Sequence, residues 1–296
     1  MLITIFTPTY NRATFLLKLY KSLCYQSIKE FEWVIVDDGS TDNTKEVVAE
    51  IIKNNEAKNS FKINYIEKSN GGKHTAINRG VKEAKGELFL ILDSDDSLPS
   101  YALETISEKY KEIENDNSFA GVCGLMAHHN GQQIGSGLPT EIIDTDAISL
   151  RFKYHVIGDL LEVFRTDVMR EFPFPEIKGE RFCPEQLVWF RIAQKYKLHC
   201  FNKIVYYRDY LEGGLTDKII KIRMKSPIAT TICYGEMLDL HIPIKSKIKA
   251  AINYWRFYFC IGDKSKIRKR INLLWVGLLP IGWAFHIKDR IRINKK

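Results

Sequence analysis

Three aspartates close together in the sequence have the residue type and the spacing of a cation site. Asp93, Asp95 and Asp96 fall within four positions, so their charges repel one another unless a cation or solvent relieves the repulsion. Carboxylate oxygens suit Mg²⁺ or Mn²⁺, which keep several waters and take further ligands from a bound phosphate. A turn rich in aspartate and serine that caps the following helix explains the same residues. This segment alone leaves both interpretations open.

A second acidic pair, Asp37 and Asp38, precedes Gly39. A carboxylate here can accept a hydrogen bond from the imide N–H of uracil, and an exposed turn explains the pair equally well. Neither acidic group is decisive separately. Together, at the ends of neighbouring strands, they would form a cleft for a nucleotide diphosphate and a cation.

Apolar strands and amphipathic helices alternate over the first 100 residues. The strands are predicted at 2–6, 33–36, 61–66 and 87–92, and the helices at 13–24, 43–54 and 73–85. This alternation predicts a parallel sheet covered on both faces. Ligands bind beyond the carboxyl ends of such strands, where the strand order reverses. We therefore expect Tyr10, the pair at 37–38 and the group at 93–96 at one edge of the sheet.

The charge of the protein is concentrated at its C-terminal end. The chain has 296 residues, 45% hydrophobic and 27% charged, which is typical of a globular protein with one large or two small domains. Its net charge is +8, but residues 264–296 hold ten Lys or Arg against Asp289 alone, and the first 263 residues sum to −1. A nucleic-acid-binding body is therefore disfavoured, and the basic tail favours a polyanionic surface, most simply an anionic membrane.

Cysteine spacing and the first residues bear on the compartment. The six cysteines are far apart and form no C-x-x-C pair, so a structural zinc site and a redox dithiol are not supported. We interpret them as free core residues in a reducing compartment. The apolar run at 2–6 has no basic region before it and stops at Thr7-Pro8, which predicts a buried strand rather than a signal peptide, and a cytoplasmic protein.

Four motifs in order resemble the family 2 glycosyltransferases of the GT-A fold. They are Thr7-Pro8-Thr9-Tyr10-Asn11-Arg12, Val36-Asp37-Asp38-Gly39-Ser40-Thr41-Asp42, the segment from Asn70-Gly71-Gly72 to Ala76-Ile77-Asn78-Arg79-Gly80, and the DXD-type Leu92-Asp93-Ser94-Asp95-Asp96. The resemblance is dense over residues 1–100 and looser to about 215. It implies an α/β fold with a GT-A-like mixed sheet, whose parallel nucleotide-binding half is flanked by helices.

The resemblance also implies a division of the chain and an enzymatic activity. Residues 1–217 would form the catalytic domain, with a donor half at 1–100 and an acceptor half at 101–217, and 218–296 would form a helical, basic extension. The activity implied is metal-dependent, inverting transfer of a sugar from a nucleotide-diphosphate donor, a UDP-sugar, to a saccharide or lipid-linked saccharide.

By match to the family's motifs, several residues would bind the donor. Pro8 and Tyr10 would flank the base and Asp38 would bond it. Asp93, Ser94 and Asp95 would reach the ribose and the Mn²⁺ or Mg²⁺ ion, with Asp96 as an additional metal ligand. Ile77 stands where the family usually has an arginine that contacts a phosphate or the base, and Lys73 would substitute for it. A solvated loop lysine is the other interpretation of Lys73.

Glu185 is the candidate general base. Family members carry Glu-Asp before a helix with Trp and Arg, and alignment on Trp189 and Arg191 places Glu185 at the base position and Pro184 at that of the preceding Glu. Helical spacing puts Glu185 on an otherwise apolar face. The alternative is a first-turn glutamate that complements the helix dipole.

Weaker candidates lie in the second half of the chain. Asp159, Glu162 and His155 are candidates for the acceptor side, although such residues are more often structural. The glycines in 210–216 suggest a loop that closes over the donor.

The uncharged stretch in the basic tail is short for a membrane span. Residues 271–287 are 17 uncharged residues, broken by Gly277, Pro280 and Gly282 and flanked by basic residues. A span takes roughly 20 apolar residues, so an interfacial segment on the inner face of the cell membrane is favoured over a span, with a buried helix hairpin as the alternative.

Other nucleotide-binding folds lack their signatures here. No G-x-x-x-x-G-K-[ST] or G-x-G-x-x-G motif occurs where those folds need it. A sugar nucleotidyltransferase would need a glycine-rich loop where this chain has Pro8-Thr9-Tyr10. A catalytically silent, membrane-associated binding protein is the alternative from another class, and it has no use for the acidic cluster or for Glu185.

Overall fold

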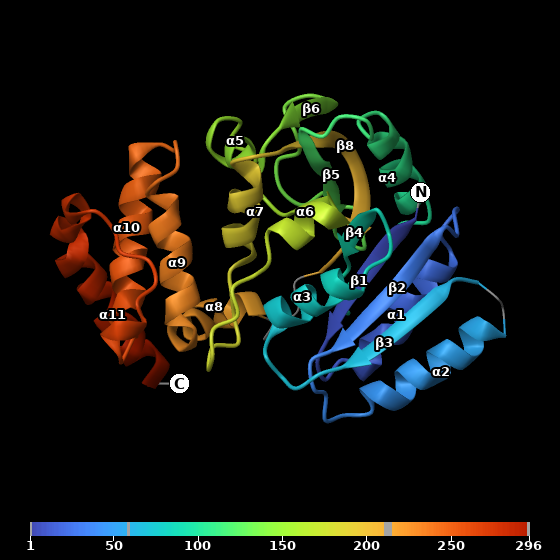
Figure 1. The fold of residues 1–296 in the computed structure, drawn as a ribbon, viewed down its shortest axis with the longest axis horizontal. Helices are drawn as coiled ribbons and strands as arrows, with labels where there is room; N and C mark the ends of the chain where they lie inside the picture. Colours follow the sequence, from blue (N-terminus) through green and yellow to red (C-terminus); the bar gives the residue numbers. More distant parts are fainter. Residues whose placement is uncertain (1, 58–59, 210–214, 295–296) are drawn as a thin grey trace. The chain divides into compact units, whose positions relative to one another are not determined.

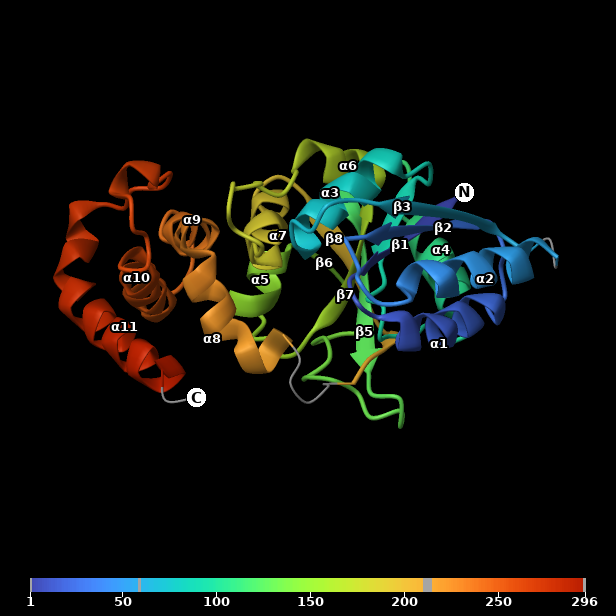
Figure 2. The same ribbon diagram turned by 90° about the horizontal axis from the view of Figure 1, so that it is seen from below.

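The computed structural model describes residues 2–57, 60–209 and 215–294. The chain forms two compact units, one of Met1–Pro173 and Phe190–Asp209 and the other of Phe174–Trp189 and Tyr210–Lys296. Residues 174–189, which end in the middle of helix α7 (Glu185–Ala193), therefore belong to the same unit as the C-terminal helices. In the sequence they lie between the two parts of the first unit. Figures 1 and 2 show the chain from two sides.

One mixed sheet organises the first unit (Figure 1). Its strands are β1 (Ile3–Thr9), β2 (Phe31–Asp37), β3 (Lys62–Glu67), β4 (Leu88–Ile91), β5 (Phe119–Ala127), β6 (Ile142–Thr145), β7 (Leu160–Arg165) and β8 (Lys197–Tyr207). Their order is β3-β2-β1-β4-β7-β5-β8-β6. The first four are mutually parallel where they pair, β7 runs antiparallel to both β4 and β5, and β8 is parallel to β5 and antiparallel to β6. The predicted mixed sheet with a parallel half is confirmed.

Helices cover both faces of the parallel half, as the apolar strands predict. On one face, α1 (Ala13–Cys24), α2 (Thr44–Glu56) and α4 (Ala102–Lys111) share a core with every second residue of the strands, for example Ile3 and Ile5. On the other lie α3 (Lys73–Glu83) and α6 (Thr166–Glu171), as Figure 2 shows. Phe6 points to that side, where a Cβ at Gly80 would lie 2.2 Å from its ring, so the glycine permits the close packing of α3.

The strand directions bring six carboxyl ends to one edge of the sheet, those of β1, β2, β3, β4, β5 and β8. Two successive antiparallel pairings, β4 with β7 and β7 with β5, leave β5 and β8 running in the same direction as β1, β2 and β4. The strand order reverses between β1 and β4, because β2 and β3 follow on one side and the later strands on the other. In parallel α/β sheets such a reversal is where ligands bind.

The second unit is helical. It contains α8 (Leu215–Lys225), α9 (Pro227–Met237), α10 (Ile244–Tyr258), the short helices η1 (Lys264–Lys266) and η2 (Leu273–Leu278), and α11 (Leu279–Asn294). The carboxylate of the buried Glu180 accepts hydrogen bonds from the backbone N–H groups of Ile228 and Ala229, at 2.6 and 2.8 Å, and so caps α9. None of the described helices combines the length and the apolar character needed to cross a membrane.

Candidate active site

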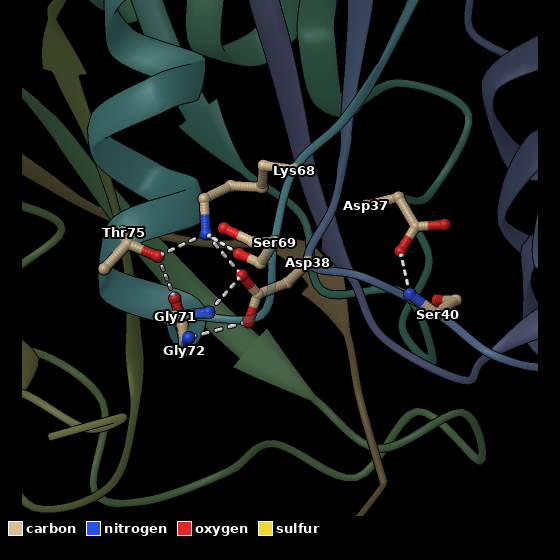
Figure 3. A network of polar contacts seen from close by, with 8 residues as sticks. All are labelled: Asp37, Asp38, Ser40, Lys68, Ser69, Gly71, Gly72 and Thr75. Atoms are coloured by element: carbon tan, nitrogen blue, oxygen red, sulfur yellow. Dashed lines mark hydrogen bonds and ion pairs between the residues drawn. The ribbon is translucent and has the colours of Figure 1, made fainter. Parts of the chain in front are cut away.

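A buried carboxylate closes the turn between β3 and α3 (Figure 3). Asp38, directly after β2, accepts hydrogen bonds at Oδ1 from Lys68 Nζ (2.6 Å) and Gly71 N (2.9 Å), and at Oδ2 from Gly72 N (2.7 Å). Lys68 also donates to the Ser69 carbonyl and to Thr75 Oγ1. Charge-assisted bonds of this kind are the strong ones in proteins. The start of α3 is therefore fastened to the end of β2.

The glycine pair is required by this geometry. Gly72 has φ +95°, a left-handed conformation that favours glycine. A Cβ at Gly71 would lie 2.7 Å from Thr75 Oγ1 and 3.1 Å from Lys68 Nζ. Side chains at either position would displace the two backbone N–H groups that converge on Asp38.

The Asp37 carboxylate has other hydrogen-bond partners than that of Asp38. Its Oδ1 accepts a hydrogen bond from Ser40 N at 2.7 Å, and its Oδ2 accepts one from the Tyr65 hydroxyl at 2.7 Å. Burial and this carboxylate raise the pKa of Tyr65 above its ordinary value. Asn11, which has φ +52°, then joins this turn to the end of β1: its N–H donates to Ser40 Oγ and its Oδ1 accepts from Thr41 N.

The three clustered carboxylates turn to three different partners. Asp93 receives Lys73 Nζ on both oxygens, at 2.7 and 2.8 Å, and Asp95 lies 3.7 Å from the Arg12 guanidinium. Asp96 is only 3% exposed and accepts a hydrogen bond from the Tyr206 hydroxyl at 2.7 Å. Burial, and then the charge of Asp93, raises the pKa of Asp96 to about 7.

This donor set fits a hard divalent cation that also binds phosphate. Within the described part of the chain, no three His, Cys, Asp or Glu side chains are grouped so that they could hold a metal. The Asp93 and Asp95 side chains are partly exposed, and each lies against a single cation in the ion pairs above. Mg²⁺ is usually held by one or two carboxylates together with waters and substrate phosphates. Asp93 and Asp95 match this pattern, whereas the oxygen of Asp96 nearest Tyr206 is occupied.

Direct contacts join the motifs at the predicted edge of the sheet. Gly72 bonds Asp38 through its N–H, and the next residue, Lys73, pairs with Asp93. The structure thus brings together the ends of β2 and β4 through the first residues of α3. Tyr10, after β1, is 46% exposed, Pro8 is half-buried and Ser94 is buried.

The remaining candidates belong to other elements of the chain. Glu185 is half-buried and is the first residue of α7, in the second unit. Asp159 pairs with Arg208 at 2.9 Å, Glu162 is half-buried on β7, and His155 is exposed with φ +55°. The candidate closing loop includes residues 210–214, which lie outside the described residues.

Three further residues at this edge, Lys68, Tyr206 and Arg208, were not predicted from the sequence as site residues. Lys68 directly follows β3, so the strand-end rule that singled out the aspartates would have found it too. Tyr206 and Arg208 stand at the end of β8 and are spaced from the aspartates by more than a hundred residues. Burial alone would lower the pKa of Arg208, but the carboxylates of Asp96, Asp159 and Asp93 outweigh it and raise that pKa. Nothing local in the sequence signals these pairings.

Comparison with known proteins shows the family of the chain. The sequence model described as glycosyl transferase family 2 matches residues 4–153, which is half of the chain. The chain belongs to glycosyl transferase family 2. As a family 2 glycosyltransferase it is similar to the GalNAc(5)-diNAcBac-PP-undecaprenol beta-1,3-glucosyltransferase of Campylobacter jejuni, at 29% identity over 222 residues, covering 72% of this chain and 67% of that protein. It is also similar to an uncharacterized glycosyltransferase of Rickettsia conorii, at 31% identity over 232 residues, and covers only 33% of that protein.

Solved structures show that this glycosyltransferase has the GT-A type of fold. Residues 1–349 of S. aureus TarS, in complex with UDP, match with a TM-score of 0.61 at 20% identity, covering 95% of this chain and 80% of that one. A mannosyltransferase of Pyrobaculum calidifontis, in complex with GDP-Man and Mn²⁺, matches with a TM-score of 0.55 at 18% identity, covering 96% of this chain and 73% of that one.

Proposed function

We propose that this glycosyltransferase moves a sugar from a nucleotide-diphosphate donor, a UDP-sugar, to a saccharide or a lipid-linked saccharide. The observation that carries the proposal is the meeting of Asp38, the glycine turn, Lys73 and Asp93 where the strand order reverses. Family membership favours this reaction over the sugar nucleotidyltransferase and the silent binding protein. Support for the donor comes from S. aureus TarS, a structural relative described in complex with UDP and with UDP-GlcNAc.

The donor would be bound by residues at or just after the ends of β1, β2 and β4, near the place where the strand order reverses. Pro8 and Tyr10 would flank the base, since the exposed ring of Tyr10 offers a stacking surface. Asp38 would accept the imide N–H of uracil, and Ser94 lies in the turn that would meet the ribose. When the donor binds, the Lys73 ammonium would leave Asp93 and pair with the diphosphate, which carries more negative charge.

Asp93 and Asp95 would hold Mn²⁺ or Mg²⁺, with Asp96 as a further candidate whose neighbouring Tyr206 already uses one of its oxygens. When bound, the ion would neutralise negative charge on the leaving nucleoside diphosphate. The chain's own cations at this edge, Lys73, Arg12 and Arg208, would add to that stabilisation.

Glu185 would act as the general base. The acceptor hydroxyl would give its proton to the Glu185 carboxylate and attack the anomeric carbon as the bond to the diphosphate breaks, which inverts the configuration of that carbon. The base must be ionised at the start of this step.

Two measurements test the reaction. Incubation with a panel of UDP- and GDP-sugars and Mn²⁺ should release nucleoside diphosphate from one donor. Glu185→Gln should abolish transfer and leave donor affinity unchanged, while Glu176→Gln, an exposed glutamate of the same segment, should retain both. Wild-type turnover in Glu185→Gln would remove Glu185 from the mechanism.

We also propose that the enzyme is cytoplasmic and peripheral on the inner face of the cell membrane, and that residues 264–296 contact the anionic lipids. Leu273 and Leu274 of η2 are 85% and 78% exposed, and Trp283 of α11 is 53% exposed. Basic residues lie on both sides of this apolar stretch. Apolar side chains beside cations are typical of interfacial segments. The Campylobacter relative is named for a PP-undecaprenol substrate, which supports a lipid-linked acceptor.

Point substitutions test the membrane surface better than a deletion. Trp255 of α10 bonds the Trp275 carbonyl, and Arg256 forms an ion pair with Asp289, so deleting the tail would expose α10. The double variant Leu273→Glu, Leu274→Glu should lose binding to vesicles that contain phosphatidylglycerol. Ile157→Glu, which changes an apolar residue that is 71% exposed in the first unit, should not. Equal binding of both variants to these vesicles would refute the proposal that residues 264–296 contact the membrane.

A further inference from the structure

The turn that carries Asp93 and Asp95 is fastened to β8. The Tyr206 hydroxyl, buried on β8, accepts a hydrogen bond from Asp93 N at 3.0 Å and donates one to Asp96 Oδ2 at 2.7 Å. The next residue, Tyr207, exchanges two backbone hydrogen bonds with Ser97, at 3.0 and 2.8 Å. Both ends of the turn are thus bonded to adjacent residues of one strand.

A histidine adds a third connection. Ser97 Oγ lies 2.9 Å from His129 Nε2, and His129 Nδ1 lies 2.6 Å from Asp209 Oδ2. Both ring nitrogens of His129 are therefore engaged, one with the turn and one with the residue that follows β8 by two positions. His128 Nδ1 lies 3.1 Å from the other carboxylate oxygen of Asp209.

The strand order explains why the turn bonds to β8 through these contacts and not through a strand ladder. Strand β4, which leads into the turn, and β8 are separated in the sheet by β7 and β5. The chain between Ile91 and Ser97 therefore crosses the end of the sheet without continuing a strand ladder. The bonds to β8 therefore fix the backbone of this turn, while the carboxylates of Asp93 and Asp95 also contact Lys73 and Arg12.

We propose that Tyr206 and His129 are positioning residues of the donor site, which hold the Asp93–Ser97 turn in the geometry that a cation and a diphosphate require. The inference rests on the proposed donor site. Groups that orient metal ligands typically change metal affinity by about 10- to 100-fold when they are removed. Neither side chain is assigned a contact with the donor or with the reacting atoms.

The test compares two tyrosines that differ in location. Tyr206→Phe removes the two bonds to the turn. Tyr110→Phe is the matched control, because Tyr110 is equally buried and its hydroxyl donates to Glu87 at 2.6 Å, at the start of β4 and so at the opposite end of that strand. Binding of UDP with Mn²⁺ is measured by calorimetry, and the melting temperature Tm is recorded for each variant.

We expect Tyr206→Phe to weaken binding of UDP with Mn²⁺ by about 10- to 100-fold, and Tyr110→Phe to weaken it less than about twofold at a comparable loss of Tm. His129→Ala should weaken binding in the same direction, and His129→Gln, which can restore the bond to Ser97, should recover part of it. KM for the donor should rise more than kcat falls.

The outcomes separate this inference from the proposed function. Unchanged affinity in both Tyr206→Phe and His129→Ala, with a wild type that binds UDP and Mn²⁺, overturns the positioning role and leaves the donor site intact. Equal losses in Tyr206→Phe and Tyr110→Phe overturn it as well, because they indicate a general effect on stability. A wild type that binds no UDP with Mn²⁺ overturns the donor site and this inference with it.

Discussion

The buried carboxyl of Asp96 gives the stability of the first unit an unusual pH dependence. Its ordinary pKa is 3.8, and burial beside the charge of Asp93 raises it to about 7. Below the lower value the group is protonated in the folded and the unfolded chain. As the pH rises from there to about 7, the unfolded chain loses the proton first, so the free energy of unfolding falls.

The size of this effect follows from the two pKa values. A carboxyl whose pKa rises from 3.8 to about 7 on folding loses about 4 kcal/mol of folding free energy between low pH and pH 8.5. About 3 kcal/mol of this change falls between pH 4.5 and 8.5. Asp96→Asn cannot ionise and keeps an acceptor oxygen for Tyr206. Relative to the wild type, this variant should therefore gain about 3 kcal/mol between those two pH values.

Urea unfolding, followed by circular dichroism at several pH values, measures this difference. Comparing the same two proteins at two pH values cancels any constant cost of the amide. Asp116→Asn is the control. Hydrogen bonds from Ser118 lower the pKa of the exposed Asp116 from its ordinary 3.8, so its contribution to stability changes only at lower pH, and the difference between this variant and the wild type should stay nearly constant between pH 4.5 and 8.5. A difference between Asp96→Asn and wild type that stays constant with pH would refute the reasoning, because it would mean that Asp96 is already ionised in the folded protein.

Three further predictions concern the turn before α3. Asp38→Asn should lower the free energy of unfolding by about 2–4 kcal/mol, because it leaves Lys68 and one glycine N–H without the carboxylate; a loss under about 0.5 kcal/mol in urea unfolding would contradict the network. Lys73→Met should bind Mn²⁺ alone more tightly and UDP more weakly, since Lys73 competes for Asp93 and would contact the diphosphate; calorimetry showing both affinities moving in one direction would argue against this exchange. Gly71→Ala should lose about 1–3 kcal/mol through its clash with Thr75, and an unchanged melting temperature would show that the turn adapts.

Local patterns in the sequence were enough for much of the first unit. The runs that became β1 and β2 are mainly apolar, and almost every residue in them is buried because helices cover both faces. Strand β6, in contrast, was not predicted: it has four residues, two of them exposed, and it exists through its pairing with β8. Such a short edge strand has no hydrophobic period of its own.

The candidate site divides in the same way. Residue types and strand ends were sufficient to expect that Asp38 and the 93–96 group would meet. That Asp96 turns inward to Tyr206, 110 positions away, and that Asp93 faces Lys73 could not be predicted. The membership of 174–189 in the helical unit is also a matter of long-range contacts.

The sequence by itself determined which segments become strands and helices and which polar residues stand at the strand ends, because hydrophobic period and turn chemistry act over a few neighbouring residues. Only the tertiary structure decided the insertion of the antiparallel β7 beside β4 and the separate partners of the three aspartates. Strand order and buried ion pairs depend on contacts between residues that are distant in the chain, and no local pattern encodes which of the possible partners packs closest.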